Sequence, residues 1–193
     1  MEINDNDEIF RTRKFRGRPS SDAGRPEAEI AVYDFLDKAG VEYVTLTHRP
    51  AFTMEECEAV RREAGAPVFK NLFLTNRQQT DFYLLLMPGD KPFKTKILSK
   101  QIGSARLSFG SAEHMEKYLD ITPGSVSVLG LMNDAENHVK LLIDADLLKD
   151  EFIGCHPCIN TSTLRFKMSD MTGKLLPAVR HEMTVVELPW EVE

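Results

Sequence analysis

Residues 154–163 read GCHPCINTST, and they place a histidine, two cysteines, an asparagine and three hydroxyl side chains within ten positions. Residues 139–143 before this stretch are apolar and predict a buried strand, which a short acidic segment follows. Residues 163–168 after it alternate between polar and apolar side chains, as a strand with one solvated face does. Polar groups held between two strands are typical of a pocket floor, so we expect a functional site here.

The other segments predict strands mixed with short helices, without the regular alternation of a doubly wound parallel sheet. The predicted helices cover residues 26–40, 53–64, 94–102 and 112–119, a helical turn up to residue 148, and a last helix that Ser169 and Asp170 cap. The predicted strands cover residues 41–46, 70–74, 81–87, 105–109, 139–143, 163–168 and 183–188. Pro123-Gly124 predicts a turn that leads into residues 125–131.

This order favours an α+β fold with a mixed, curled, barrel-like β-sheet and helices around it. Residues 1–25 are polar and rich in Gly, Pro and Ser, and they predict a flexible N-terminal tail. Residues 26–193 then form a single domain, which is an ordinary size for one hydrophobic core.

The composition is that of a soluble globular protein, with 42% hydrophobic and 28% charged residues. No apolar run reaches the length of a membrane span, and the first residues do not resemble a signal peptide. Three cysteines, an odd number, argue for a reducing compartment. We therefore expect a cytoplasmic protein that does not associate with membranes.

The formal net charge is −6, yet the cations are clustered. Phosphate binding depends on the local charge, because salt screens interactions beyond about 10 Å. Either cluster can be an ordinary solvated face or a surface for nucleic acid. One cluster comprises Arg11, Arg13, Lys14, Arg16 and Arg18, and the other comprises Lys91, Lys94, Lys96, Lys100 and Arg106.

Cys155 and Cys158 form a C-x-x-C pair, but the sequence does not favour redox chemistry or metal binding there. A thioredoxin-like pair needs its first cysteine at the start of a helix, and the residues that follow predict a strand. A structural zinc site needs a second pair of ligands, which the sequence lacks. We expect both cysteines to serve packing, and we expect no metal and no cofactor.

Single residues leave two interpretations open. His156 is either a structural histidine or a catalytic one, and Pro157 favours an extended backbone beside it. Lys70, at the entrance of a predicted strand, is either solvated or a cation aimed at a phosphate or a carbonyl oxygen. The chain has no G-x-S-x-G, P-loop, G-x-G-x-x-G or H-E-x-x-H motif, which weighs against common hydrolase and nucleotide-binding folds.

Several segments, in order, resemble the YbaK-like aminoacyl-tRNA editing domains, which are related to the insertion domain of bacterial prolyl-tRNA synthetases. The resemblance spans residues 26–188 and is nearest to the freestanding, PrdX-like deacylases of alanyl-tRNA(Pro). The matching segments are residues 70–74 (KNLFL), 106–109 (RLSF), 122–126 (TPGSV), 131–134 (LMND), and His156-Pro157 with Asn160, Thr161 and Thr163.

The resemblance implies the YbaK-like fold and a set of site residues. The implied catalytic positions are Lys70, Asn71, Gly124 and His156. The implied or expected substrate-binding positions are Ser125, Asn133, Asp134, Asn160, Thr161, Lys94, Lys96 and Arg106. The family often has a proline four residues after the glycine of its loop, where this chain has Val128, and this difference bears on specificity.

The implied activity is hydrolysis of the ester of mischarged tRNA(Pro), with alanyl-tRNA(Pro) as the expected substrate. The alternatives are a deacylase for another amino acid, cysteine or serine, and a non-catalytic tRNA-binding or regulatory protein. The expected partners are the acceptor end of the tRNA and prolyl-tRNA synthetase.

Overall fold

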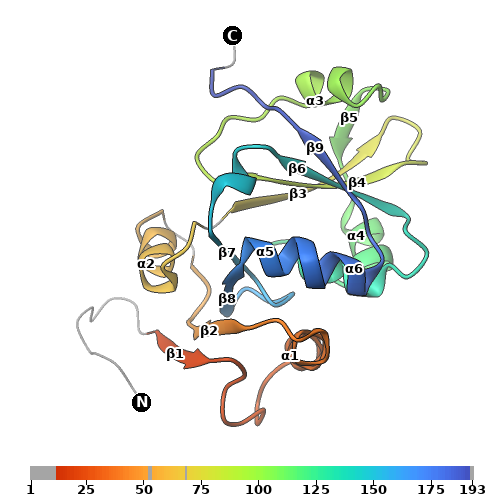
Figure 1. The fold of residues 1–193 in the computed structure, drawn as a ribbon. Helices are drawn as coiled ribbons and strands as arrows, with labels where there is room; N and C mark the ends of the chain where they lie inside the picture. Colours follow the sequence, from red (N-terminus) through yellow and green to blue (C-terminus); the bar gives the residue numbers. More distant parts are fainter. Residues whose placement is uncertain (1–11, 52–53, 68, 192–193) are drawn as a thin grey trace.

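The computed structural model describes residues 12–51, 54–67 and 69–191, and its elements form two stacked sheets with helices around them (Figure 1). The strands are β1 (Arg13–Arg16), β2 (Tyr43–Thr47), β3 (Phe69–Asn76), β4 (Phe82–Pro88), β5 (Leu107–Phe109), β6 (Val139–Asp144), β7 (Phe152–Cys155), β8 (Ser162–Lys167) and β9 (Met183–Val186). The α-helices are α1 (Glu27–Ala39), α2 (Met54–Ala64), α3 (Thr95–Gln101), α4 (Ala112–Leu119), α5 (Met168–Asp170) and α6 (Leu176–Val179). Short 3-10 helices η1 (Val128–Asn133) and η2 (Leu147–Lys149) and a π-helical turn η3 (Met171–Leu175) complete the set.

One sheet has four antiparallel strands in the order β1-β2-β8-β7, and the other has five in the order β5-β3-β4-β6-β9. In the second sheet β3 is antiparallel to β4 and β5, whereas β6 is parallel to both β4 and β9. The α+β class with mixed strand directions is confirmed. The strands divide into two open sheets, which the single curled sheet of the prediction did not anticipate.

The main core fills the space between the two sheets. It includes Phe73 and Leu84 from the five-stranded sheet and Leu164 and Phe166 from the four-stranded one, together with α1 and the continuous helical segment α5-η3-α6. Figure 1 shows this helical segment running across the front of the molecule between the sheets. Burial on both sides explains why β4 is apolar at nearly every position.

Two smaller cores cover the outer faces. Leu74, Leu85 and Leu98 belong to a cluster beneath α3 on the five-stranded sheet. Leu46, Val60 and Ala64 join β2 to α2 on the four-stranded sheet. Each sheet is therefore packed on both faces, and neighbouring residues of one strand serve different cores.

Several predicted boundaries change. Arg13–Arg16, which we expected in a flexible tail, forms β1 because its backbone pairs with β2 from Thr47 to Val44. β7 was not predicted, and residues 128–133 of the segment after Pro123-Gly124 form a 3-10 helix. The last helical segment begins at Met168, so Ser169 and Asp170 lie inside it and do not cap it. The expected start of α2 at Thr53, and residues 1–11 of the tail, lie outside the described residues.

Candidate active site

A cavity of about 260 Å³ lies where the two sheets meet, next to the residue 154–163 stretch. Its walls come from the start of β3, the turn after α4, the end of β7 and the start of β8. The lining residues are Phe69, Asn71, Gly124, Val126, Cys155, His156 and Thr163. The structure thus brings together three of the four expected catalytic residues: Asn71, Gly124 and His156.

His156 directly follows β7, and its ring is oriented by one backbone contact. Nδ1 lies 2.9 Å from the Ser162 carbonyl oxygen, which can only accept a hydrogen bond, so Nδ1 carries the proton. Burial lowers the pKa of His156 below the usual value for histidine. The neutral ring therefore has an unprotonated Nε2.

A second histidine, His48, lies behind the cavity wall with its ring centroid 6.4 Å from that of His156. Its Nδ1 donates to the Arg49 carbonyl oxygen at 2.8 Å, and its Nε2 lies 2.9 Å from Thr163 Oγ1. Burial lowers the pKa of His48 as well, and the nearby His156 adds to this shift. In a neutral His48, Nε2 is unprotonated and accepts a hydrogen bond from the Thr163 hydroxyl group.

Neither His48 nor Thr163 was among the predicted site residues. His48 was assigned to a turn after a strand, and Thr163 to a strand with a solvated face. Their contact joins positions 115 residues apart and depends on the pairing of β2 with β8, in which Leu46 lies opposite Thr163. Only this pairing reveals that the two side chains meet.

Asn71 contributes a polar side chain to the cavity wall. Its Nδ2 lies 3.5 Å from the Phe69 carbonyl oxygen, while its Oδ1 is buried and has no hydrogen-bond partner among the described residues. A buried carbonyl oxygen without a partner costs free energy of about 1–3 kcal/mol. Asn71 thus lines the cavity with its side chain, while its Oδ1 is enclosed by the protein.

Gly124 lies in a tight turn at the cavity edge. The Ser125 amide donates to the Thr122 carbonyl oxygen at 3.2 Å, and Gly124 has a φ of +90°. Proline at the second position and a residue with positive φ at the third define a type II turn, for which glycine is the favoured residue. The predicted turn at Pro123-Gly124 is therefore confirmed, and its peptide groups border the cavity.

Lys70 does not line the cavity. Its Nζ donates to the Lys91 carbonyl oxygen at 2.9 Å. Side chains alternate along β3, so Lys70 faces the side of Leu74 while Asn71 faces the side of Phe73. The structure separates these two neighbours onto opposite faces of the sheet.

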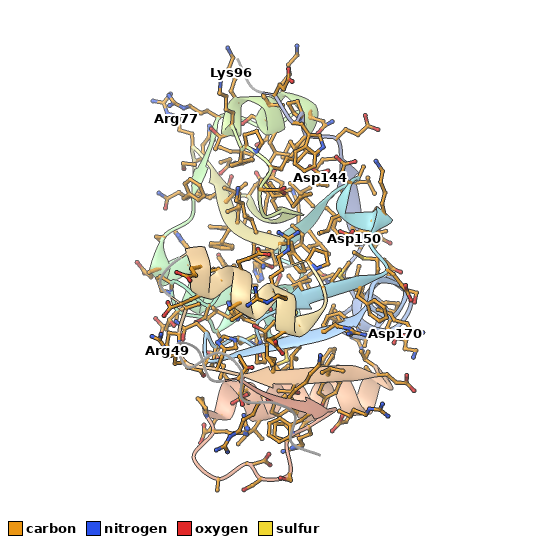
Figure 2. All side chains as sticks on the ribbon, turned by 90° about the vertical axis from the view of Figure 1, so that its left-hand side faces the viewer. Arg49, Arg77, Lys96, Asp144, Asp150 and Asp170 are labelled. Atoms are coloured by element: carbon orange, nitrogen blue, oxygen red, sulfur yellow. The ribbon has the colours of Figure 1, made fainter. Side chains whose placement is uncertain are left out.

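The Lys91 residue that holds Lys70 is itself fixed by a buried ion pair. Its ammonium is only 1% exposed and contacts both carboxylate oxygens of Asp144, at 2.9 and 2.8 Å, and one of Asp146 at 2.8 Å. Figure 2 shows Asp144 inside the upper half of the molecule, away from the lower end. Lys91, predicted as part of a basic surface, is therefore a structural residue.

Asn133 and Asp134 also lie outside the cavity lining. Asn133 Nδ2 donates to the Leu119 carbonyl oxygen at 2.8 Å, which ties η1 to α4. Asp134 accepts from the backbone amides of His138 and Val139 and from Nε2 of His181. Both side chains hold the chain between η1 and β6.

The remaining predicted contacts lie around the cavity. Ser125 is buried in the turn, and Asn160 is half-buried outside the lining. The Thr161 carbonyl oxygen accepts from the His48 amide at 2.9 Å, and Thr161 itself borders a second, polar hollow beside β1. Ser125 and Thr161 thus shape the site through the backbone.

Cys155 and Cys158 are buried members of the main core. Cys155 is the last residue of β7 and not the first of a helix, so no helix dipole lowers its pKa. Burial raises the pKa of the Cys155 thiol, and it raises that of Cys158 to about 12. Both cysteines remain protonated at neutral pH, as packing residues do.

The predicted cationic contacts Lys94, Lys96 and Arg106 are exposed, on and beside α3 and β5. Figure 2 shows Lys96 and Arg77 extending from the same end of the molecule, far from Arg49. Phe109, which is 63% exposed, lies near this group and contacts Phe93 edge-on. Arg77 and Phe109 were not among the predicted contacts.

Within the described ranges, no helix is long and apolar enough to span a membrane.

Comparisons with known proteins identify the family of the chain. The sequence model of the aminoacyl-tRNA editing domain family matches residues 48–173. The prolyl-tRNA editing protein ProX of Acetoanaerobium sticklandii is 32% identical over 162 residues, covering 84% of this chain and 98% of that protein. The prolyl-tRNA synthetase associated domain-containing protein 1 of Danio rerio is 26% identical, covering 79% of this chain and 83% of that protein.

A crystal structure of a proposed trans-editing enzyme for prolyl tRNA synthetase superposes with a TM-score of 0.60, over 85% of this chain and 99% of that one. The two sequences are 14% identical, so this likeness shows the fold alone.

Proposed function

The chain belongs to the aminoacyl-tRNA editing domain family, and we propose that it hydrolyses the ester of mischarged tRNA(Pro), with alanyl-tRNA(Pro) as its preferred substrate. The observation that carries this proposal is the small cavity that gathers Asn71, Gly124 and His156. Its volume of about 260 Å³ is below the range of sites for drug-sized ligands and is large enough for an amino acid. The protein thereby contributes to translation fidelity.

The reaction makes modest demands on the protein. An aminoacyl ester is already activated, so the site has to position water and stabilise the oxyanion that develops on the carbonyl oxygen. The neutral Nε2 of His156 can accept a hydrogen bond from the attacking water, and the ribose hydroxyl beside the ester can assist. Backbone N–H groups at the Gly124 turn can stabilise the oxyanion.

Lys70 retains a proposed role at the phosphate end of the substrate. Its ammonium has three donors, and one of them is used by the Lys91 carbonyl oxygen. The four-carbon side chain lets the remaining donors reach a terminal phosphate beyond the start of β3. This role does not require Lys70 to enter the cavity.

Size selects the amino acid. Phe69, Val126 and Cys155 form the apolar part of the wall, and we propose that contact with this wall favours alanyl over the larger prolyl group. A synthetase rejects a smaller amino acid by only about 1–3 kcal/mol per missing methylene, so a second, smaller site is needed for accurate charging.

The acceptor stem of the tRNA would lie on the basic end of the molecule. We propose that Lys94, Lys96 and Arg106 contact its phosphates, which positions the substrate without reading its sequence. Prolyl-tRNA synthetase is the expected second partner, because it supplies the mischarged tRNA.

The test is a deacylation assay with tRNA(Pro) that carries alanine, proline, serine or cysteine. We expect alanyl-tRNA(Pro) to be hydrolysed fastest and prolyl-tRNA(Pro) to remain intact. Faster hydrolysis of the seryl or cysteinyl ester would change the substrate and keep the reaction. No hydrolysis above the spontaneous rate, with tRNA binding retained, would identify a non-catalytic tRNA-binding protein.

A further inference from the structure

A second hollow, which we call the β1 hollow, lies between β1, β2, the start of β8 and the loop before α1. Its volume is about 400 Å³, and in the described part of the chain it shares no lining residue with the candidate active site. Figure 1 places β1 at the opposite end of the molecule from α3, so the hollow is also separate from the basic end. The proposed function therefore assigns no role to it.

The floor of the β1 hollow is a row of three side chains on neighbouring strands. Arg13 of β1 lies opposite Thr47 of β2, and Thr47 lies opposite Ser162 of β8. Directly opposed residues of paired strands point to the same face of a sheet, and all three line the hollow. Arg16 lies three positions further along β1, so its side chain points to the other face.

The loop that covers this row is braced by two arginines. Arg18 donates to Asp22 within the loop at 3.0 Å and to Asp34 of α1 at 2.6 Å. Arg25 donates to the Ser21 carbonyl oxygen at 3.1 Å. These contacts tie the loop to itself and to α1, which fixes the shape of the hollow.

The charges of the lining leave one cation without a counterion. Glu29, the one acidic residue of the described lining, is 1% exposed and pairs with Arg25 at 2.9 Å. The same oxygen of Glu29 also accepts from the hydroxyl groups of Tyr33 and Ser162, at 2.5 and 2.6 Å. Arg13 has no ion pair within residues 12–51, 54–67 and 69–191. Two arginines against one glutamate leave the lining with a net charge of +1.

Hydroxyl groups supply further donors beside Arg13. Ser21 Oγ accepts from the Ala23 amide at 3.2 Å, which leaves its own proton for a ligand. Ser20 and Thr161 also line the hollow. A carboxylate has two oxygens in one plane, whereas the terminal oxygens of a phosphate group point in three directions. Donors from both the floor and the loop therefore match a phosphate better than a carboxylate.

We infer that the β1 hollow binds a phosphate group, with Arg13 as its charged partner and the three hydroxyl groups as further donors. The planar fork of a guanidinium matches two phosphate oxygens at once. The hollow lies behind the candidate active site, because Ser162 lines it while the Ser162 carbonyl oxygen holds His156 Nδ1. The phosphate belongs either to a free mononucleotide or to an RNA backbone, and the test separates these sources.

The test follows the backbone amide signals of the isotope-labelled protein by NMR at constant ionic strength. The probes are inorganic phosphate, adenosine 5′-monophosphate, a single-stranded hexanucleotide RNA without terminal phosphates, and acetate. We expect the signals of residues 19–26 to shift with each phosphate probe that binds, and acetate to bind at least about tenfold more weakly than inorganic phosphate. Tighter binding of the mononucleotide or of the RNA identifies the source of the phosphate.

Two arginine variants of one strand assign the binding to Arg13. Arg13→Ala removes the cation of the hollow, and the matched control Arg16→Ala removes the same charge from the exposed opposite face of β1. We expect Arg13→Ala to raise the dissociation constant of the tightest phosphate probe at least about tenfold, because a charge-assisted hydrogen bond is lost. Arg16→Ala should change it less than about twofold, since exposed charges are screened. Arg13→Lys keeps the charge without the fork and should retain part of the affinity.

Three results would overturn the inference: no binding of any phosphate probe at millimolar concentration, signal shifts confined to residues outside the hollow, or an equal loss of affinity in the two alanine variants. Acetate binding as tight as that of inorganic phosphate would overturn it as well, because the hollow would then select charge alone. No probe contains an aminoacyl ester, so the result does not depend on the deacylation assay.

Discussion

Lys70 and Asn71 show what one residue of displacement along a strand does to a site. Asn71 lies in the cavity wall, and its Oδ1 has no hydrogen-bond partner in the described part of the chain, whereas Lys70 is held on the other face by the Lys91 carbonyl oxygen. Because the two residues are neighbours in the sequence, both were expected in the catalytic site. Successive side chains of a strand point to opposite faces of the sheet, so only one of the two faces the cavity. Their roles must therefore differ.

Replacing Lys70 by alanine tests the phosphate role that we propose for it. We expect Lys70→Ala to lower the single-turnover deacylation rate at least about a hundredfold, as the loss of a positioned charge can do. The free energy of unfolding should fall by only about 1 kcal/mol, because one hydrogen bond is lost. Chemical denaturation of the same sample measures this free energy of unfolding.

The control for this variant is Lys140→Ala, on the neighbouring part of the same sheet. Lys140 is exposed and pairs with Asp81 at 2.7 Å, so its loss removes a charge without touching the site. A folded Lys70→Ala protein with the rate of the control would remove Lys70 from the catalytic set.

At the scale of elements, the Gly124 turn is the part of the site that depends most on backbone conformation. Its φ of +90° is unfavourable for any residue with a Cβ, although a Cβ there would meet no atom within 4 Å. We expect Gly124→Ala to lower both the free energy of unfolding, by about 1–2 kcal/mol, and the deacylation rate.

Gly40 provides a matched control for the turn. It ends α1 with a φ of +67°, and a Cβ there would also meet no atom within 4 Å. Gly40→Ala should cost a similar free energy of unfolding and leave deacylation intact. If the two variants lose activity equally, the effect is one of stability and the Gly124 turn has no special role.

Local patterns predicted most elements, and the failures were at places where long-range pairing decides. β3, β4, β6 and β8 follow from apolar runs and alternation, and α1 from its acidic first turn and Gly40. The sequence of β1 is polar, so we assigned it to a tail. It forms a strand only because it pairs with β2. The site shows the same limit: His156 was visible in the sequence, but His48 was not, because its partner Thr163 comes from another strand.

At the scale of the whole molecule, the basic end carries the proposed contact with the tRNA. Lys94 and Lys96 are exposed at α3, and Figure 1 places α3 at the opposite end of the molecule from α1. We expect a Lys94→Ala, Lys96→Ala double variant to bind tRNA more weakly and to reduce the slope of log K against log salt by about 2, since each phosphate contact contributes about 0.9. The rate with saturating substrate should change little.

A second double variant, Lys38→Ala with Lys174→Ala, removes the same charge near the α1 end. We expect this variant to leave the slope of log K against log salt unchanged. The comparison then distinguishes a local phosphate contact from a general effect of the lower net charge. An unchanged slope in the Lys94 and Lys96 variant would show that these lysines only solvate α3, and it would direct attention to the cations of β1.

The central claim is that the cavity of Asn71, Gly124 and His156 sorts the amino acids esterified to tRNA(Pro). The most direct measurement is the ratio of single-turnover hydrolysis rates for alanyl-tRNA(Pro) and prolyl-tRNA(Pro), in the wild-type protein and in Val126→Ala, which enlarges the cavity. We predict a wild-type ratio above about a hundred and a fall of at least about tenfold in the variant, since one methylene is worth roughly 10–200-fold. Equal hydrolysis of both esters by the wild-type protein would contradict the account.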